Sequence, residues 1–382
     1  MSVILQVLFW LFTVTVAYVY FGYPLLLLIL SKIRLTSPVQ KVDITPNVSL
    51  IISAYNEERV IAQKIENSLA LDYPREKLEI IIVSDGSTDR TNDIVRTFVE
   101  LGVKLIVLNS NQGKSSAQNG AVAEAQGEIL FFTDTDLILS PDALSKVIRN
   151  FADESVGCVI GRINYLNEHD TCVSKGEGMY WQYELFLRNK ESKLGNFAMG
   201  SGIMAIRHDL FQPLDPDVGE DFVLPVQTAM AEHRVIYESE AVSETILGQM
   251  KARDMFRSKV RVITKDLRGL FLHHAILNPF RYPLYAWGLI SHKLLRWLIP
   301  YFLITIFIIN LLLLCHPFYR LTLALQMTFY ASALIGYLWQ KKGKPPRILG
   351  IPFSFCLVNL ATLIGVGRFL MGKRAGQWKP LR

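Results

Sequence analysis

Two aspartates with alternating spacing, Asp134 and Asp136, directly follow the apolar run Phe131-Phe132-Thr133. Side chains two residues apart on an extended segment point to the same side, so both carboxylates would face one place. They would repel each other unless a cation lay beside them, and Mg²⁺ or Mn²⁺ is typically held by one or two carboxylates together with substrate phosphates. The spacing therefore predicts a metal site at these aspartates. The alternative, a turn before a helix start at Ser140-Pro141-Asp142, explains neither of them.

A second acidic pair, Glu220-Asp221, stands between Gly219 and the mostly apolar stretch Phe222-Val223-Leu224-Pro225. Apolar surroundings disfavour the charged form of a carboxylate and raise its pKa, which suits a general base working near neutral pH. The pair is therefore a candidate catalytic site, with Asp221 as the base and Glu220 beside it. The alternative is a helix N-terminus that its acidic residues stabilise through the helix dipole.

Three further polar clusters suit a nucleotide. Residues 53–57 combine a small residue, an aromatic ring and a carboxylate, which can hold a nucleobase by stacking and hydrogen bonding. Asp85 can accept the imide hydrogen of a uracil ring, and Lys114 at a helix start can meet a diphosphate. Each cluster also has a plainer interpretation as a turn, a helix cap or a solvated lysine. The candidate nucleotide-binding residues are Ala54, Tyr55, Glu57, Asp85, Lys114 and Asp134.

A basic segment follows later in the chain. Arg257 and Arg261 are four residues apart and would share one face of a helix, which Lys265 would extend. Such a face can hold a leaving diphosphate, and we take Arg257, Lys259 and Arg261 as its candidates. The rival interpretation is a basic face that lies against anionic lipid.

The elements that must position these residues alternate along the chain. Apolar runs predict strands and periodic runs predict helices in turn. The alternation predicts an α/β fold with a mostly parallel sheet and helices on both faces, which binds ligands at the carboxyl ends of its strands. The predicted strands are residues 48–53, 78–83, 104–108 and 128–133, and the predicted helices are 57–71, 89–101 and 115–125.

Charge is divided unevenly along the 382 residues. The net charge is +6, which by itself would be compatible with a nucleic-acid binder. However, residues 32–266 sum to −8, whereas residues 267–382 contain 14 Lys and Arg and no acidic residue. A nucleic-acid groove would need its cations on the globular part, so the pattern excludes nucleic acid as a partner and indicates a lipid bilayer instead.

Long uncharged runs predict the membrane helices, which are residues 2–30, 297–319, 321–340 and 348–367, with 285–296 as an interfacial helix. Lys32, Arg34 and Lys41 place the N-terminus outside and the next domain in the cytoplasm. Four spans would then put the basic C-terminal tail outside, against the positive-inside rule. Residues 348–370 therefore either span or re-enter, with spanning preferred. The expected division is an anchor over 1–31, a cytoplasmic catalytic domain over 45–270 and a membrane region over 271–382.

Taken together, the clusters over residues 48–265 resemble the membrane-bound family 2 glycosyltransferases, which include cellulose, chitin, hyaluronan and poly-N-acetylglucosamine synthases. The resemblance implies a GT-A fold with one N-terminal and about three C-terminal membrane helices, and a UDP-sugar donor. It implies that Tyr55, Glu57 and Asp85 bind the nucleoside, Asp134 contacts the nucleotide, Asp136 coordinates the metal and Asp221 is the base. It also implies an acceptor site at Gly200, Ser201 and Gly202, with Trp181 before them.

One motif departs from this family. Processive members carry Gln-x-x-Arg-Trp, and here Ser258 and Val262 replace the Gln and the Trp around Arg261. Processivity is therefore more in doubt than transfer itself. The predicted function is inverting, metal-dependent transfer of a hexose or N-acetylhexosamine to a growing polysaccharide or glycan, making β-linkages, by a multi-pass protein of the bacterial inner membrane that is linked to exopolysaccharide. The alternatives are single addition to a polyprenyl phosphate or lipid, and a non-catalytic membrane protein that binds a nucleotide or polymer. Partner subunits stay open.

Overall fold

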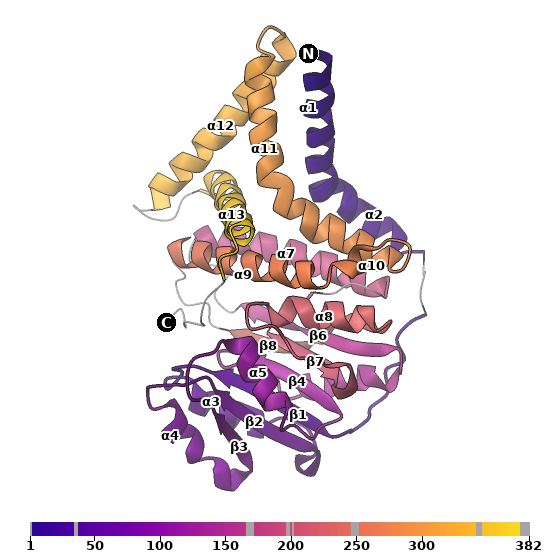
Figure 1. Ribbon diagram of the computed structural model, residues 1–382, viewed down its shortest axis with the longest axis vertical. Coiled ribbons are helices and arrows are strands. Elements are labelled where there is room, and N and C mark those ends of the chain that lie inside the picture. The colour runs from indigo at the N-terminus through magenta and orange to yellow at the C-terminus, as the bar shows by residue number, and fades with distance from the viewer. Residues whose placement is uncertain are drawn as a thin grey trace.

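The computed structural model has three levels (Figure 1). A sheet with its covering helices forms one end, the long helices α7 and α9 run across the middle, and α1, α11 and α12 extend away on the far side. The structure describes residues 2–33, 37–165, 172–195, 199–200, 202–245, 252–340 and 346–374.

The first half of the sheet is parallel and confirms the prediction. Its strands are β1 (Val48–Ala54), β2 (Leu78–Ser84), β3 (Val103–Val107) and β4 (Ile129–Asp134), in the order β3-β2-β1-β4. They form strands because each is an apolar run, and both faces of β1 are buried. The helices α3 (Ile61–Leu69) and α4 (Thr91–Arg96) cover one face and α5 (Lys114–Val122) covers the other.

The second half of the sheet combines parallel and antiparallel strands, and none of these strands was predicted from the sequence. β7 (Ile203–Arg207) runs antiparallel to both β4 and β6 (Val156–Tyr165), and β8 (Arg234–Thr245) is parallel to β6. The short β5 (Ile138–Leu139) closes the edge against β8. The antiparallel β7 lets the chain return beside β4, so the end of β4 faces the residues just before β7. The helices α6 (Ala143–Ile148) and α8 (Glu220–Met230) pack on opposite faces of this half.

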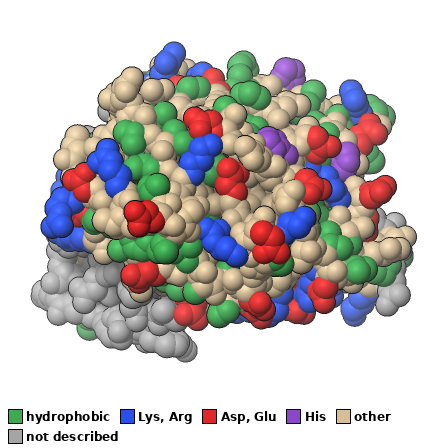
Figure 2. All heavy atoms as spheres, turned by 90° about the horizontal axis from the view of Figure 1, so that it is seen from below, with side chains coloured by type: hydrophobic (Ala, Val, Ile, Leu, Met, Phe, Trp, Pro, Cys, Tyr) green, Lys and Arg blue, Asp and Glu red, His purple; other side chains and the backbone are tan. Residues whose placement is uncertain are grey.

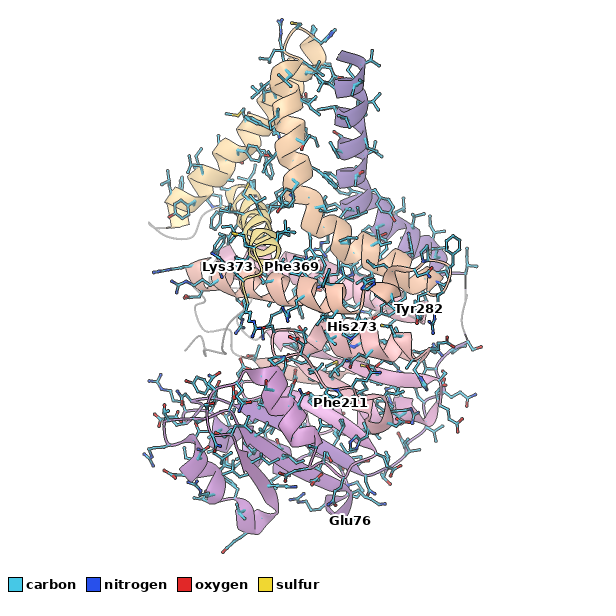
Figure 3. The ribbon with its side chains drawn as sticks, viewed as in Figure 1. Glu76, Phe211, His273, Tyr282, Phe369 and Lys373 are labelled. Atoms are coloured by element: carbon cyan, nitrogen blue, oxygen red, sulfur yellow. The ribbon has the colours of Figure 1, made fainter. Side chains whose placement is uncertain are left out.

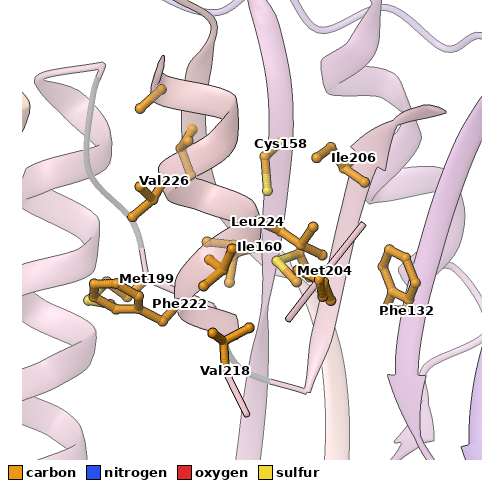
Figure 4. Close-up of a cluster of buried hydrophobic side chains, with 14 of the residues drawn as sticks. Phe132, Cys158, Ile160, Met199, Met204, Ile206, Val218, Phe222, Leu224 and Val226 are labelled. Atoms are coloured by element: carbon orange, nitrogen blue, oxygen red, sulfur yellow. The ribbon is translucent and has the colours of Figure 1, made fainter. Parts of the chain in front are cut away.

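The hydrophobic core lies on both faces of the sheet. On one face, side chains of β4, β6 and β7 meet α8, as the contacts around Phe132, Met204 and Leu224 show (Figure 4). On the opposite face of the molecule from the long apolar helices, acidic and basic side chains are interspersed (Figure 2). That surface is typical of a domain that faces water.

A layer of two long helices separates the sheet from the apolar helices. α7 (Cys172–Lys193) and α9 (Ala252–Leu272) lie across the molecule (Figure 1). Tyr23 and Leu27 of the N-terminal helices pack against Leu187 and Leu194 on the α7 side. The N-terminal apolar helix is thereby fixed to the candidate catalytic part of the chain, which carries the sheet and the helices up to α9.

Four helices are long and apolar enough to cross a membrane, namely Val3–Leu30, Pro283–Leu312, Pro317–Trp339 and Ile348–Leu370. The first comprises α1 (Ser2–Ala17) and α2 (Tyr23–Leu30), joined by a π-helical turn, Tyr18–Gly22. The second comprises α10 (Pro283–Leu289), a π-helical turn (Ile290–Leu294) and α11 (Leu295–Leu312). The predicted interfacial helix 285–296 is therefore the first part of one bent helix, and it continues directly into the predicted span.

The last two apolar helices behave differently from each other. α12 (Pro317–Gln340) extends away from the sheet with α11 (Figure 1), whereas α13 (Arg347–Leu370) follows α9. Near the start of α13, Phe353 packs on Met255, and further on Thr264 donates a hydrogen bond of 3.2 Å to the carbonyl of Gly365. Phe369, labelled in Figure 3, has its ring centroid 6.1 Å from that of Phe271 on α9. α13 thus contacts a helix of the catalytic part along its length.

Candidate active site

The Asp134–Asp136 segment is a turn. β4 ends at Asp134, and Thr135 and Asp136 form the turn that follows, so the prediction that both aspartates stand on one extended segment is wrong. The physical reason is that the pairing of β4 with β7 stops at Thr133 and that with β1 stops at Asp134. Asp134 is partly buried and Asp136 is exposed. Both still lie at the carboxyl end of β4, where the prediction put them.

Lys114 joins the two acidic clusters. Its Nζ forms ion pairs with Asp134 and with Glu220, which are far apart in the sequence. Burial acts to lower the pKa of Lys114, but these two carboxylates raise it above its ordinary value, so the ammonium stays charged. Burial likewise acts to raise the pKa of Glu220, and Lys114 holds it below its ordinary value. The structure therefore brings three of the predicted clusters together.

Asp85 holds the loop that presents Lys114. Its Oδ1 accepts a hydrogen bond from the backbone N–H of Gln112 (2.7 Å), and its Oδ2 accepts one from Gly113 (2.8 Å). Gly113 has a φ of +95°, which favours glycine, and Lys114 begins α5 directly after it. Asp85 is fully buried. This supporting role was not predicted, and the proposed contact of Asp85 with a base remains a prediction.

The loops that follow β1 and β2 are bonded to each other. Asn56, with a φ of +54°, accepts a hydrogen bond at Oδ1 from Thr88 N (2.8 Å), and Glu57 N donates to Thr91 Oγ1 (2.8 Å). They meet because β1 and β2 are adjacent and parallel. Of the predicted residues here, Tyr55 is partly exposed, whereas Ala54 and Glu57 are buried. The proposed contact of Ala54 with a nucleotide remains a prediction.

Asp221 has the environment expected of a general base. It lies in the first turn of α8, and burial, followed by the charges of Glu220 and Asp266, raises its pKa to about 7. Its backbone carbonyl accepts a hydrogen bond of 2.8 Å from Gly200 N. A Cβ on Gly200 would lie 2.6 Å from that carbonyl oxygen, so only glycine fits there. The acceptor stretch and the candidate base are therefore in contact.

Asp266 and Lys293 belong to the site and were missed. Asp266 is buried on α9, and burial raises its pKa above the ordinary value. Lys293 Nζ donates to its Oδ2 (3.5 Å) from the π-helical turn of the Pro283–Leu312 helix. One signal was available, because Asp266 is the last acidic residue of the chain. Lys293 lies within the predicted interfacial helix 285–296.

A buried ionic network fixes α7 to the bent apolar helix. His292 Nε2 lies 3.0 Å from Glu184 Oε2 and its Nδ1 lies 2.7 Å from Glu191 Oε1, while Arg296 Nη1 donates to Glu184 (2.5 Å). Tyr23 of α2 donates to Glu191 (2.7 Å). Burial acts to raise the pKa of Glu184, but the charges of Arg296 and His292 hold it well below its usual range. The network joins both membrane-side helices to the catalytic part.

The basic face of α9 reaches the site at one end. Lys265 is partly buried, and burial lowers its pKa while Glu220 opposes the shift. Arg261 is one turn earlier and partly buried, and Arg257 is one turn earlier still and exposed. Lys259 is two residues from Arg261, so it leaves α9 from the opposite side. Arg257, Arg261 and Lys265 thus form the predicted basic face, which approaches Lys114 at its Lys265 end. Lys259 is not part of this face.

The acceptor residues flank both acidic clusters. Gly200 contacts Asp221, and a Cβ on Gly202 would lie 3.0 Å from Asp134 Oδ2 and 2.2 Å from Leu137 Cδ1. Trp181 is half-buried on α7, and its Nε1 donates to the carbonyl of Ile163 (3.3 Å). Ser201 lies outside the described residues.

The aspartate turn is compatible with a divalent metal that is completed by a substrate. Asp134 uses Oδ1 for Lys114, and its Oδ2 lies beside Gly202, where a Cβ would crowd it at 3.0 Å. Within the described part of the chain, no group of three or more His, Cys, Asp or Glu side chains is arranged to hold a metal. A metal here would therefore take further ligands from water and substrate phosphates, which is the usual arrangement for Mg²⁺.

Comparison with known proteins agrees with this geometry. Residues 49–214 match the family described as glycosyl transferase family 2. The chain is also similar in structure to the mannosyltransferase PcManGT from Pyrobaculum calidifontis, solved in complex with GDP-Man and Mn²⁺. That likeness has a TM-score of 0.73 at 23% sequence identity and covers 96% of this chain and 100% of the other. It shows that the fold is shared along almost the whole chain, apolar helices included.

Relatives by sequence are glycosyltransferases. A probable glycosyltransferase, YdaM, of Bacillus subtilis is 37% identical over 34% of this chain and 32% of its own length. An N-acetylglucosaminyltransferase of Rhizobium meliloti is 28% identical over 62% of this chain and 60% of its own length. A beta-monoglucosyldiacylglycerol synthase of Nostoc is 33% identical over 39% of this chain and 33% of its own length. The chain thus matches between about a third and three fifths of these relatives.

Proposed function

We propose that the chain is a family 2 glycosyltransferase, which transfers a sugar from a UDP-sugar to an acceptor at a membrane, with inversion. The observation that carries the proposal is the pairing of Lys114 with both Asp134 and Glu220. This pairing places the candidate donor site and the candidate base in one site. The names of the relatives support a hexose or an N-acetylhexosamine as the transferred sugar.

The residues of the site divide the chemistry between them. Asp221 removes the proton from the acceptor hydroxyl, whose oxygen forms a bond to the anomeric carbon. The bond from that carbon to the diphosphate breaks on the opposite side, and the electron pair leaves with the diphosphate. Lys114, Lys265 and Arg261 supply fixed positive charge where the diphosphate charge develops. An α-linked donor therefore gives a β-linked product.

A divalent cation fits the donor side. Asp136 and Asp134 would hold Mg²⁺ or Mn²⁺, which supplies further positive charge to the diphosphate when it is bound. Tyr55 and the loops after β1 and β2 would hold the nucleoside. Glu57 and Asp85 are both buried at the base of those loops, where they help to fix the loop conformation. These assignments rest on the position of each residue at a strand end.

The acceptor decides between a polymer and a single addition. Val262, in place of the family's Trp, is exposed on α9 and supplies no aromatic floor for a sugar. The missing aromatic ring argues against processive extension and not against transfer. We propose that the acceptor is a glycan, with addition to a lipid or polyprenyl phosphate as the alternative. A purely binding role is disfavoured, because Asp134, Asp136 and Asp221 all lie in the assembled site.

We further propose that α13 lies at the membrane surface and that α1, α11 and α12 cross the bilayer. α13 follows α9 along its length, and just after it Arg374 Nε lies 3.4 Å from Asp217 Oδ2 in the catalytic part. The C-terminal end is then on the side of the catalytic part, which agrees with the positive-inside rule. Residues 1–31, 45–270 and 271–382 would be the anchor, the cytoplasmic domain and the membrane region.

The test uses the full chain purified in detergent. It is incubated with a panel of UDP-sugars and Mg²⁺ or Mn²⁺, with a glycan primer or a lipid extract, and the products are sized by mass. We expect transfer from one UDP-sugar in the wild type and none from Asp221→Asn, which should still bind UDP. Transfer by Asp221→Asn at the wild-type rate, or no transfer from any donor, would overturn the proposal.

A further inference from the structure

Two arginines between α7 and the sheet have no carboxylate partner among the described residues. Arg188 of α7 is 7% exposed, and Arg162 of β6 is partly buried. In the part of the chain that the structure describes, no carboxylate lies within ion-pair distance of either guanidinium. Nε and Nη1 of Arg188 and Nε of Arg162 are buried without a hydrogen-bond partner. A buried charge left in this state is costly, which calls for a missing partner.

A hydroxyl group without a partner lies close to both arginines. Tyr237 of β8 is 8% exposed, and its OH is buried without a hydrogen bond. Burial raises the pKa of Tyr237 to about 12, while the charges of Arg188 and Arg162 act to lower it. Tyr237 and Arg162 stand on adjacent parallel strands, and α7 packs over β8 through a hydrogen bond of 2.8 Å between Tyr237 N and Ser192 Oγ. Three polar groups therefore lie close together between α7 and the sheet.

The cluster adjoins the candidate base. Arg188 Nη2 donates to the carbonyl of Gly200 (3.3 Å), and Gly200 N in turn donates to the carbonyl of Asp221. The guanidinium also lies over the ring of Trp181, 5.0 Å from its centroid. α7 itself packs on the N-terminal apolar helix α2. The cluster of Arg188, Arg162 and Tyr237 thus lies on the candidate acceptor side of the site, next to the apolar helices.

We propose that Arg188, Arg162 and Tyr237 form a binding site for an anionic group, a phosphate or a carboxylate, on the acceptor. This inference rests on the proposed function, because it names the class of acceptor. A guanidinium fork matches the two oxygens of a phosphate or carboxylate, and Tyr OH supplies a further donor. The anion would satisfy the orphan donors and hold the acceptor hydroxyl near Asp221. A lipid-borne phosphate is one source, and a soluble sugar acid or sugar phosphate is the other.

The test measures anion binding without transfer. The full chain carries Lys114→Met, so that the donor site does not bind the probes, and is kept in dodecyl maltoside micelles. Its unfolding temperature is followed while dodecyl phosphate, inorganic phosphate or glucuronate is added. We expect saturable stabilisation by at least one probe, and an apparent affinity at least about tenfold weaker after Arg188→Met is added. Stabilisation by dodecyl phosphate alone assigns a lipid-borne anion, and stabilisation by the soluble probes assigns a soluble one.

Arg207 provides the matched control. It is also partly buried over an aromatic ring, with its carbon Cζ 5.5 Å from the centroid of Phe151, but it donates to the carbonyls of Val156 and Phe151 at 2.8 Å. Arg207→Met should lower the unfolding temperature and leave anion binding intact. Arg188→Met removes an uncompensated buried charge but also the hydrogen bond to Gly200 and the contact with Trp181, so its anion binding is measured against its own unfolding temperature without anion.

The proposal is wrong if no probe stabilises the protein, or if Arg188→Met binds the anion as tightly as the parent. Should Arg188→Met fail to fold, Arg162→Met and Tyr237→Phe carry the same test, each with an affinity loss of several-fold. The two proposals fail separately. If the anion binds to the Lys114→Met chain while the wild-type chain transfers sugar from none of the UDP-sugars, only the proposed function is overturned.

Discussion

At the scale of single residues, the site is defined by buried charges that depend on one another. Asp221 has its pKa raised to about 7 by burial, Glu220 and Asp266, and Lys114 divides its charge between Asp134 and Glu220. Neutralising any one of these groups changes the environment of the others. Substitutions here should therefore affect the chemistry through defined pKa values.

The pH dependence of transfer should report Asp221. A general base works only when it is deprotonated, so kcat/KM should fall tenfold per pH unit below about pH 7 and level off above it. Asp221→Asn should reduce kcat by at least about 10²-fold and abolish this slope. Initial rates from pH 5.5 to 8.5 measure it, and a rate that is flat across pH 7 would exclude Asp221 as the base.

Lys64 should act as a positioning residue for the aspartate turn. It is fully buried on α3, and its Nζ donates to Thr133 Oγ1 (3.1 Å) and to the carbonyl of Leu137 (2.5 Å), on either side of the turn. Lys64→Met removes both bonds, so the half-saturating Mn²⁺ concentration should rise about tenfold. Mn²⁺ binding is measured by calorimetry with UDP present, beside the control Lys104→Met at a half-buried lysine of β3 that pairs with Glu124. An unchanged Mn²⁺ affinity in a folded Lys64→Met protein would contradict this role.

At the scale of elements, polar residues couple the apolar helices to the catalytic part. The π-helical turn at Ile290–Leu294 points His292 towards α7 and Lys293 towards α9 within one turn of helix. A π-turn adds a residue to a helix and re-aims the side chains that follow it. The Pro283–Leu312 helix is thus both a candidate membrane span and a part of the wall of the site.

Breaking the Glu184–Arg296 pair should destabilise the junction of these elements. Arg296→Met leaves Glu184 buried with less compensation, which typically costs about 3–5 kcal/mol for a buried pair. Its unfolding temperature in detergent should fall well below that of Arg320→Met, an exposed-site control on α12. The double variant Glu184→Gln/Arg296→Met should recover part of the loss. Equal unfolding temperatures for the two single variants would argue against the network as a structural link.

At the scale of the whole molecule, the proposed topology depends on the path of α13. Its packing on α9 from Met255 to the region of Thr264 supports the proposed position of α13 at the membrane surface. The pairing of Arg374 with Asp217 keeps the end of the described chain beside the same part. If α13 lies at the surface, the basic residues that a four-span arrangement would leave outside are on the inside.

Reporter fusions should show opposite sides for the two termini. A fluorescent protein that matures only in the cytoplasm should be bright at the C-terminus and dark at the N-terminus, and a periplasmic phosphatase should give the reverse pattern. The same pair placed after Gln340, at the end of α12, should match the C-terminal result. A dark C-terminal fusion that is well expressed would instead support four spans and overturn the surface position of α13.

The sequence by itself determined the parallel half of the sheet and the long apolar helices. Each strand of that half is a continuous apolar run and each apolar helix is an uninterrupted one, so local pattern is sufficient for both. It also placed Asp134 and Asp85 correctly at strand ends, because apolar runs end where polar residues begin. The basic segment was placed correctly on a helix because Arg257 and Arg261 are four residues apart.

Only the tertiary structure decided how these parts meet. The antiparallel return of β7 brings Gly200 and Gly202 to the acidic clusters, and pairing over such separations leaves no local pattern in the sequence. Asp266, Lys293 and the arginines at 162 and 188 lie on different elements, so their neighbours could not be read from spacing. The packing of α13 on α9 also left no local signal, because an apolar helix has the same pattern whether it faces lipid or another helix.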